Sequence, residues 1–149
     1  GRQHRSSLRT QIQKQLTPVF RIRSRLELLR QADRFESSEY GFLLFQDIRW
    51  QLWPWLRLHS RLSFFETDSF DARLYQFEND LRFVMTNALL NGQGQRFYVL
   101  ADVDIGAFGS LSIKYAVSRW EDVFEVGSGL DRIAGNRRSH IGIQYRLKL

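Results

Sequence analysis

Apolar and polar side chains alternate along most of the chain, and an alternation with a period of two predicts β-strands rather than helices. The first strand is expected over residues 6–16, with Leu8, Ile12 and Leu16 on one face and Arg9 and glutamines on the other. The same pattern continues in seven further segments, whose apolar faces run through residues 20–28, 42–50, 56–64, 75–85, 97–105, 111–117 and 141–149. The sequence therefore predicts eight antiparallel strands in one meander.

The connections between these segments divide into tight turns and longer loops. Tight turns are expected at Thr17-Pro18, at Trp53-Pro54 and over 106–109, loops over 32–39, 66–72 and 121–137, and a turn or loop over 87–94. In a membrane barrel the short turns lie on one rim and the long loops on the other. Eight strands in this order break that rule, so either a strand within 64–95 is misassigned or some turns on the short-turn rim are long.

Composition narrows the class of protein. The chain has 149 residues, of which 43% are hydrophobic and 14% aromatic, a net charge of +6 and no cysteine. This size suits one domain, and no disulfide or cysteine-based metal site can form. No apolar run reaches about 18 residues, which excludes a transmembrane helix but not transmembrane strands. Because the chain starts at Gly1 without a signal peptide, we expect a processed chain or part of a longer protein.

Soluble and membrane barrels share this alternation and differ in where the apolar face points. Three features favour lipid: tryptophans near strand ends, opposite charges on the polar faces that can pair in a lumen, and a last strand that stays apolar to Leu149. The third strand is an exception, because its second face mixes Leu43 and Phe45 with Asp47 and Arg49. We predict an all-β, antiparallel, up-and-down transmembrane β-barrel of about eight strands, with residues 1–149 as a single outer-membrane domain.

This fold assigns two groups of residues. The polar faces are expected to line the lumen, with the Arg-x-Arg-x-Arg run as their sharpest feature; the candidates are Arg21, Arg23, Arg25, Arg57, His59, Arg61, Glu78, Asp80, Arg82, Asp102, Asp104, Lys114 and Arg146. The amphipathic rings at strand ends are expected at the membrane interface, and these are Trp50, Trp53, Trp55 and Trp120. The charge distribution, Arg-rich in strands two and four and acidic in strands five and six, favours a salt-bridged and largely filled lumen.

Four segments resemble the C-terminal barrel region of a family of Bacteroidota outer-membrane proteins: YGFLLFQDIRW, FETDSFDARLYQFENDLRF, NGQGQRFYVL and VGSGLDRIAGNRRSHIGIQYRLKL. The resemblance extends over roughly residues 16 to 149. Members are often labelled as helix-hairpin-helix proteins because of a separate N-terminal domain, which has no counterpart in this sequence, so DNA binding is not carried over. The final strand also resembles the outer-membrane insertion signal, with Leu149 in place of the usual aromatic residue. The resemblance implies an outer-membrane location.

Candidate chemistry is sparse. The three histidines, His4, His59 and His140, share no metal-ligand spacing, and Gly127-Ser128-Gly129 is not a nucleophile elbow. An acid–base pair of His59 or His140 with Asp47 or Glu78 is conceivable in a barrel hydrolase, but hydrogen bonding in the lumen explains these residues as well. We expect no metal, no cofactor and no enzymatic activity.

The expected function is a structural or porin-like integral protein of the outer membrane. Its partners would be outer-membrane lipids and, during insertion, the barrel assembly machinery; association with other envelope proteins is left open. The alternative is a soluble β-barrel that binds an anionic ligand or nucleic acid through its Arg-rich face. Nucleic acid is disfavoured because aromatic and arginine residues fall on opposite faces. A third possibility is that these strands form part of a wider barrel.

Overall fold

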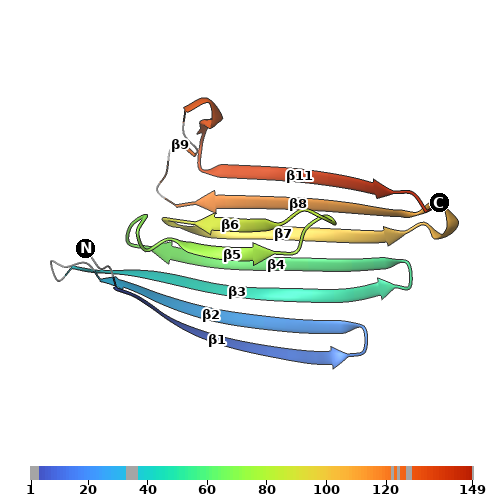
Figure 1. Cartoon of the computed structure of the whole chain (residues 1–149), viewed down its shortest axis with the longest axis horizontal. Helices are drawn as coiled ribbons and strands as arrows, with labels where there is room; N and C mark the ends of the chain where they lie inside the picture. Colours follow the sequence, from blue (N-terminus) through green and yellow to red (C-terminus); the bar gives the residue numbers. More distant parts are fainter. Residues whose placement is uncertain (1–3, 33–36, 122, 124, 127–128, 149) are drawn as a thin grey trace.

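The computed structural model describes residues 4–32, 37–121, 123, 125–126 and 129–148. It is dominated by one antiparallel sheet with the strand order β1-β2-β3-β4-β7-β8-β11. The seven strands are long, with the bounds β1 (His4–Thr17), β2 (Phe20–Ala32), β3 (Ser38–Trp53), β4 (Leu56–Thr67), β7 (Gln93–Asp104), β8 (Ser110–Trp120) and β11 (Arg137–Arg146). The sheet forms the wall of the molecule, and its strands follow one another up and down (Figure 1).

The remaining elements are short. They are β5 (Leu74–Glu78), β6 (Thr86–Leu90), the 3-10 turns η1 (Gly106–Phe108) and η2 (Gly129–Asp131), and the two-residue strands β9 (Glu125–Val126) and β10 (Ile133–Ala134). β5 and β6 pair with each other as a separate two-stranded sheet, and so do β9 and β10. Among the described residues, no helix is long and apolar enough to cross a membrane.

The hairpin β5–β6 lies against one face of the wall (Figure 1). The fifth strand predicted from the sequence is therefore wrong, because residues 74–78 pair with β6 and not with β4. Both ends of the hairpin are fixed at the end of β4. Asp68 N donates to Tyr40 O of β3 (2.9 Å), and Thr67 N donates to Gly92 O (3.0 Å).

Removal of this strand from the wall resolves the conflict between turns and loops. The three tight connections, β1–β2, β3–β4 and β7–β8, all lie at one end of the wall, which we call the turn end. The connections β2–β3, β4–β7 and β8–β11 lie at the other end, which we call the loop end. The β4–β7 connection contains the whole hairpin. Of the two explanations left open by the sequence, the misassigned strand is the correct one.

The two faces of the wall differ in character. The inner face is the face covered by the hairpin, and the outer face is the opposite one. At the loop end the inner face carries apolar residues, which enclose the hairpin residues Leu74 and Leu90; the cluster consists of Leu29, Leu43, Phe45, Phe65, Ala72, Leu74 and Leu90. The mixed second face of β3 is thereby explained, because Leu43 and Phe45 are the part of the wall on which the hairpin packs.

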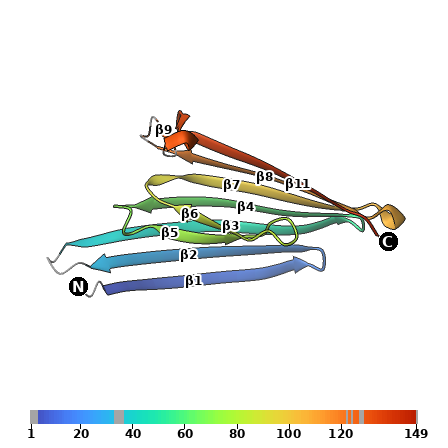
Figure 2. The same ribbon diagram turned by 45° about the horizontal axis from the view of Figure 1, so that its top comes forward.

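The wall is open, which corrects the expectation of a closed eight-stranded barrel. The edge strands β1 and β11 lie at opposite sides of the sheet and are not paired with each other (Figure 2). β1 pairs only with β2, and every one of its residues is exposed. With seven strands in up-and-down order, β1 and β11 also run in the same direction (Figure 1).

Candidate functional site

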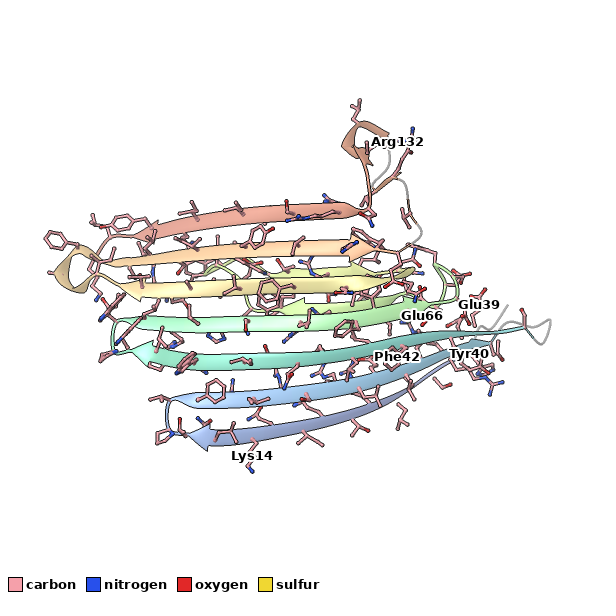
Figure 3. All side chains as sticks on the ribbon, turned by 180° about the vertical axis from the view of Figure 1, so that it is seen from behind. Lys14, Glu39, Tyr40, Phe42, Glu66 and Arg132 are labelled. Carbon is pink, nitrogen blue, oxygen red and sulfur yellow. The ribbon has the colours of Figure 1, made fainter. Side chains whose placement is uncertain are left out.

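The inner face holds the residues predicted to line a lumen, and Figure 3 shows side chains projecting from both faces of the wall. The strand register places ten of the thirteen candidates on the inner face; they are Arg21, Arg23, Arg25, Arg57, His59, Arg61, Asp102, Asp104, Lys114 and Arg146. The other three, Glu78, Asp80 and Arg82, are not wall residues. They lie at the end of β5 and in the segment that follows it, because this strand belongs to the hairpin.

A buried ionic network attaches the hairpin to the wall. Glu78 of β5 has a fully buried side chain and accepts hydrogen bonds from Arg96 Nη2 (3.0 Å) and Lys114 Nζ (3.2 Å). Lys114 Nζ also lies 2.7 Å from Asp80 Oδ2. Arg96 donates in turn to Ser118 Oγ (2.7 Å). Strands β7 and β8 thus supply the cations and the hairpin supplies the anions, an arrangement that offsets the desolvation of each charge.

Further hydrogen bonds extend this attachment to β4. Ser63 Oγ donates to Gln76 Oε1 (2.7 Å), and Gln76 Nε2 donates to Glu78 Oε1 (3.1 Å). Arg61 Nη1 donates to the backbone oxygen of Phe77 (2.7 Å). The inward side of the hairpin is therefore held to the wall by specific side-chain contacts.

The Arg-x-Arg-x-Arg run lies on one face, as period two requires. Its members have different partners. Arg23 forms an ion pair with Asp47, which also binds Arg61 Nη2 at 3.2 Å. Arg25 donates to Gln11 Oε1 (2.6 Å) and lies over the Phe45 ring at 5.1 Å. The central part of the Arg-rich face is thus engaged with carboxylate, amide and aromatic groups of the wall itself.

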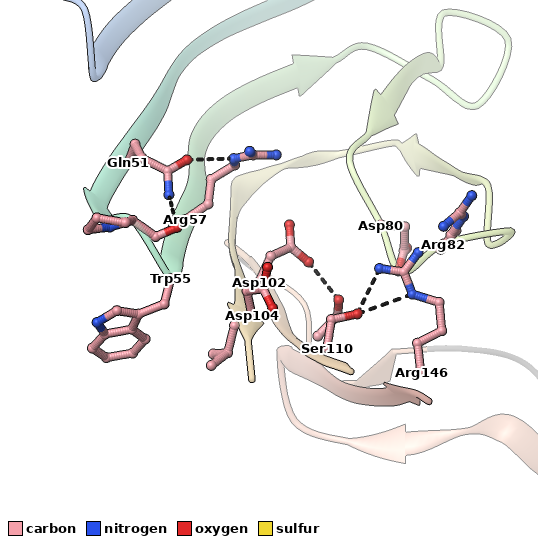
Figure 4. A pocket seen from close by; sticks show the side chains of 12 residues that line it. Gln51, Trp55, Arg57, Asp80, Arg82, Asp102, Asp104, Ser110 and Arg146 are labelled. Atoms are coloured by element: carbon pink, nitrogen blue, oxygen red, sulfur yellow. Dashed lines mark hydrogen bonds between the residues drawn. The ribbon is translucent and has the colours of Figure 1, made fainter. Parts of the chain in front are cut away.

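A polar cavity of about 400 Å³ remains on the inner face at the turn end. Its polar lining comes from β3, β4, β7, β8, β11 and the segment after β5 (Figure 4), and consists of Gln51, Arg57, Asp80, Arg82, Asp102, Asp104, Ser110, Ser112 and Arg146. At its edge the backbone N–H of Gly106 donates to Asp104 (2.9 Å), and this bond, with nearby Lys148, keeps the pKa of Asp104 below its usual value. Six of the predicted lumen residues line this one cavity.

The predicted interface tryptophans divide between the two ends. Trp50, Trp53 and Trp55 are exposed at the turn end, where the rings of Trp53 and Trp55 stack with centroids 5.4 Å apart. Trp120 lies on the inner face instead, because in β8 it shares the parity of Lys114 and Ser118. Its Nε1 donates to Asn91 O (3.0 Å) beside the end of the hairpin, so its role is to hold the plug.

Two features of the site were missed from the sequence. Arg96, the main partner of Glu78, was overlooked because it falls at the start of its strand. A repeat was also missed: residues 15–26 (QLTPVFRIRSRL) and 51–62 (QLWPWLRLHSRL) share seven of twelve residues and occupy equivalent positions in two hairpins. In each copy the glutamine closes the proline turn, through Gln15 Nε2 to Thr17 O (2.6 Å) and Gln51 Nε2 to Trp53 O (2.7 Å).

The acid–base pair considered for a hydrolase is not formed, since within the described residues no hydrogen bond joins His59 or His140 to Asp47 or Glu78. No group of three or more His, Asp or Glu side chains there is placed to hold a metal ion. His59 on β4 has Asn79 as its neighbour, with the Asn79 Nδ2 and His59 Nδ1 atoms 3.5 Å apart, and His140 lies exposed on β11.

Comparison of the chain with protein-family models, with curated proteins and with solved structures finds no match.

Proposed function

We propose that this chain forms part of the wall and the internal plug of a β-barrel in an outer membrane, with a structural role rather than a catalytic or freely conducting one. The observation that carries the proposal is the distribution of polarity over the two faces. The inner face buries Arg61, Lys114 and the hairpin residue Glu78, while the outer face leaves large apolar side chains uncovered. A soluble sheet of this size buries its apolar face, whereas a membrane barrel presents it to lipid.

The uncovered apolar residues form a band across all seven strands, interrupted on the same face by polar residues such as Lys14, Ser24, Gln46 and Ser60. Representative members are exposed by 37–70%: Leu8, Ile12, Leu26, Leu28, Leu44, Leu62, Phe64, Phe97, Ile113, Ile141, Ile143 and Tyr145. On β4 the band runs from Leu56 to Phe64, nine residues, or about 26 Å along the strand at about 3.3 Å per residue. Nine residues agree with the number that a tilted strand needs to cross the hydrocarbon core, which is about 9–11.

Polar residues limit the band at both ends. At the loop end the outer face changes to charged side chains, namely Arg30, Glu66, Arg119 and Arg137. At the turn end the exposed rings of Trp50, Trp53 and Trp55 follow the last aliphatic residues. Amphipathic rings of this kind gather at headgroup depth. The resemblance of the sequence to Bacteroidota outer-membrane barrels supports the same location.

The direction of the edge strands implies that the complete barrel is wider than seven strands. Direct closure of β1 on β11 would pair two parallel strands, whereas bacterial barrels of this class use an even number of antiparallel strands. If a second copy were related to the first by rotation about the barrel axis, β11 of one copy would pair with β1 of the other, and these two strands would again be parallel. Because lipid does not tolerate unpaired strand edges, we propose that an odd number of further strands completes the barrel.

The plug also weighs against free conduction and against the soluble alternative. The hairpin covers the middle of the inner face through the Glu78 network, and polar hollows remain at the turn end, one of them beside Arg21 and Arg49. The same hairpin covers part of the Arg-rich face: Arg61 is buried beneath it, whereas Arg25 is partly exposed and Arg57 is exposed. Arg61 is only 3% exposed and lies over the Phe45 ring at 4.1 Å, a position from which it cannot reach a polyanion.

A matched pair of substitutions on β4 tests membrane insertion. Leu62→Arg places a charge in the middle of the apolar band, and Glu66→Arg places one at the charged limit on the same strand and face. In lipid vesicles Leu62→Arg should lower the free energy of unfolding by about 2–4 kcal/mol, and Glu66→Arg by about 1 kcal/mol or less. The measurement is a urea titration followed by tryptophan fluorescence and by heat-modifiable migration on gels. A chain that stays monomeric without detergent and tolerates both substitutions equally would rule the proposal out.

A further inference from the structure

The cavity at the turn end contains three arginines that come from separate elements. Arg57 lies on β4, Arg146 on β11 and Arg82 in the segment after β5, and Figure 4 shows Asp102 and Ser110 between Arg57 and the other two. Among the described residues, none of the three has a carboxylate oxygen within 4.0 Å. Arg57 Nε donates to the Gln51 amide oxygen (3.0 Å), and Arg146 Nη2 donates to the Ser110 hydroxyl (2.7 Å).

The carboxylates of the same cavity already have partners of their own. Asp80 accepts hydrogen bonds from Lys114 Nζ (2.7 Å), Thr86 and the backbone of Leu81. Asp104 accepts from Gly106 N (2.9 Å), with Lys148 Nζ 3.4 Å away. Asp102 accepts from Ser112 Oγ (2.6 Å). None of these acids forms an ion pair with an arginine of the cavity, although Asp102 lies directly across the strand pair from Arg57.

The charge count gives the same result. The cavity is lined by three arginines and three aspartates, and contact of Asp80 with Lys114 and of Asp104 with Lys148 raises the local net charge to +2. Guanidinium groups that face one cavity repel one another, and a bound anion removes this repulsion. Each guanidinium is a fork of donors that matches oxygen atoms on one phosphorus in a bidentate manner.

We propose that this cavity binds a phosphate group carried by a small, multiply charged anion that enters from the turn end. The three donor forks line one cavity, so a ligand with several anionic oxygens can meet more than one of them, whereas a monocarboxylate offers only two oxygens and a single charge. A volume of about 400 Å³ accommodates a pyrophosphate-sized ligand and is within the usual range of small-molecule sites. The site lies on the inner face whether or not the wall is in a membrane, so it stands independently of the proposed function.

A lipid headgroup is the other source of the same chemistry. Pro54 and Trp55 of the β3–β4 turn belong to the cavity lining, so its mouth lies beside the aromatic residues of the turn end. The two sources separate experimentally, because a soluble anion binds in lipid-free detergent and a headgroup requires added lipid.

The test uses the full chain folded in detergent without lipid, with sodium pyrophosphate as the probe and 31P NMR and calorimetry as readouts. Arg57→Gln or Arg146→Gln should each weaken binding about tenfold or more, the effect expected for one charge-assisted hydrogen bond. Arg82→Gln keeps the two hydrogen bonds between the Arg82 backbone and the Gln144 side chain of β11, and it should weaken binding by a similar factor. Arg30→Gln, which removes the same charge from the outer face, is the control and should change the affinity less than twofold.

Each outcome decides the proposal. Pyrophosphate binding that is lost on substitution of the three arginines, with unchanged circular dichroism and gel migration, supports a soluble ligand. Native mass spectrometry measures the binding of phosphatidylglycerol. If the chain binds this lipid through the arginines and does not bind pyrophosphate, a lipid headgroup is the source of the phosphate. Absence of binding by the unsubstituted chain at millimolar pyrophosphate and with added lipid overturns the proposal. Equal binding by Arg57→Gln/Arg146→Gln also overturns it.

Discussion

At the scale of single residues, Glu78 has the largest consequence for stability. Its side chain is fully buried between Arg96 and Lys114. Removal of its negative charge takes away the anion that offsets the desolvation of these two cations. Breaking a buried ion pair costs about 3–5 kcal/mol, and Glu78→Gln should lower the free energy of unfolding by about 3 kcal/mol because an amide retains some hydrogen bonds. Urea titration of the folded chain measures the change. Glu66→Gln on the exposed outer face is the control and should stay within about 0.5 kcal/mol.

A double substitution shows whether this cost comes from the pair. Glu78→Gln combined with Arg96→Met removes both charges, so the combined loss should be smaller than the sum of the single losses. Simple additivity would mean that the two side chains stabilise the protein separately, contrary to the geometry of the network.

At the scale of elements, Gly41 of β3 controls how closely the hairpin approaches the wall. A Cβ atom at this position would lie 2.6 Å from the backbone oxygen of Ala72, at the start of the hairpin. Gly41→Ala should therefore displace the hairpin, lower stability by about 1–3 kcal/mol and speed tryptic cleavage after Arg73 and Arg82.

Gly142 of β11 is the matched control for this substitution. Its nearest obstacle is a methyl group of Leu81, 3.0 Å from the Cβ position, and a flexible side chain can yield. Gly142→Ala should be cleaved at the rate of the unsubstituted chain. If Gly41→Ala is cleaved no faster than that, the hairpin does not depend on this close approach.

The elements also show what the sequence pattern can and cannot predict. Period two identified the seven wall strands, because each presents one face to the plug and one to the outside. It failed at residues 75–85, since Tyr75 and Phe77 alternate with Gln76 and Glu78 in a hairpin as they would in a wall. The available signal was Asn79, which interrupts the apolar face of residues 75–85 directly after the five residues that form β5.

The site was partly predictable for a related reason. Alternation places Arg21, Arg23 and Arg25 on one face, but it does not set the register between strands, so the pairing of Arg23 with Asp47 was not foreseen. The partners of Glu78 depend on where a hairpin folds back, and no local pattern encodes that position. The apolar residues Leu43 and Phe45 on an otherwise polar face were the remaining sign that something covers the wall.

At the scale of the whole molecule, the wall is open at β1 and β11, and the outward side of the hairpin is uncovered. The hairpin presents Tyr75, Phe77 and Leu89 outward, away from the wall, and all three are more than 40% exposed. These side chains need a cover in a closed barrel, and further strands opposite the described wall would supply it. The open edges and this exposed side of the hairpin both support the proposed barrel with more strands than seven.

Paired cysteines test this conclusion, because the chain has no cysteine of its own. Thr10 and Leu26 face each other across β1 and β2, so Thr10→Cys/Leu26→Cys is the positive control and should form a disulfide in the folded protein. Thr10→Cys combined with Ser139→Cys, Ile141→Cys or Ile143→Cys should form none within one chain, because β1 and β11 each pair with other strands. Non-reducing gels of the membrane-inserted protein separate the results. An intramolecular disulfide between β1 and β11 would show that the seven strands close on themselves, and a disulfide-linked dimer would show that two copies meet at these edges; either result contradicts the wider barrel.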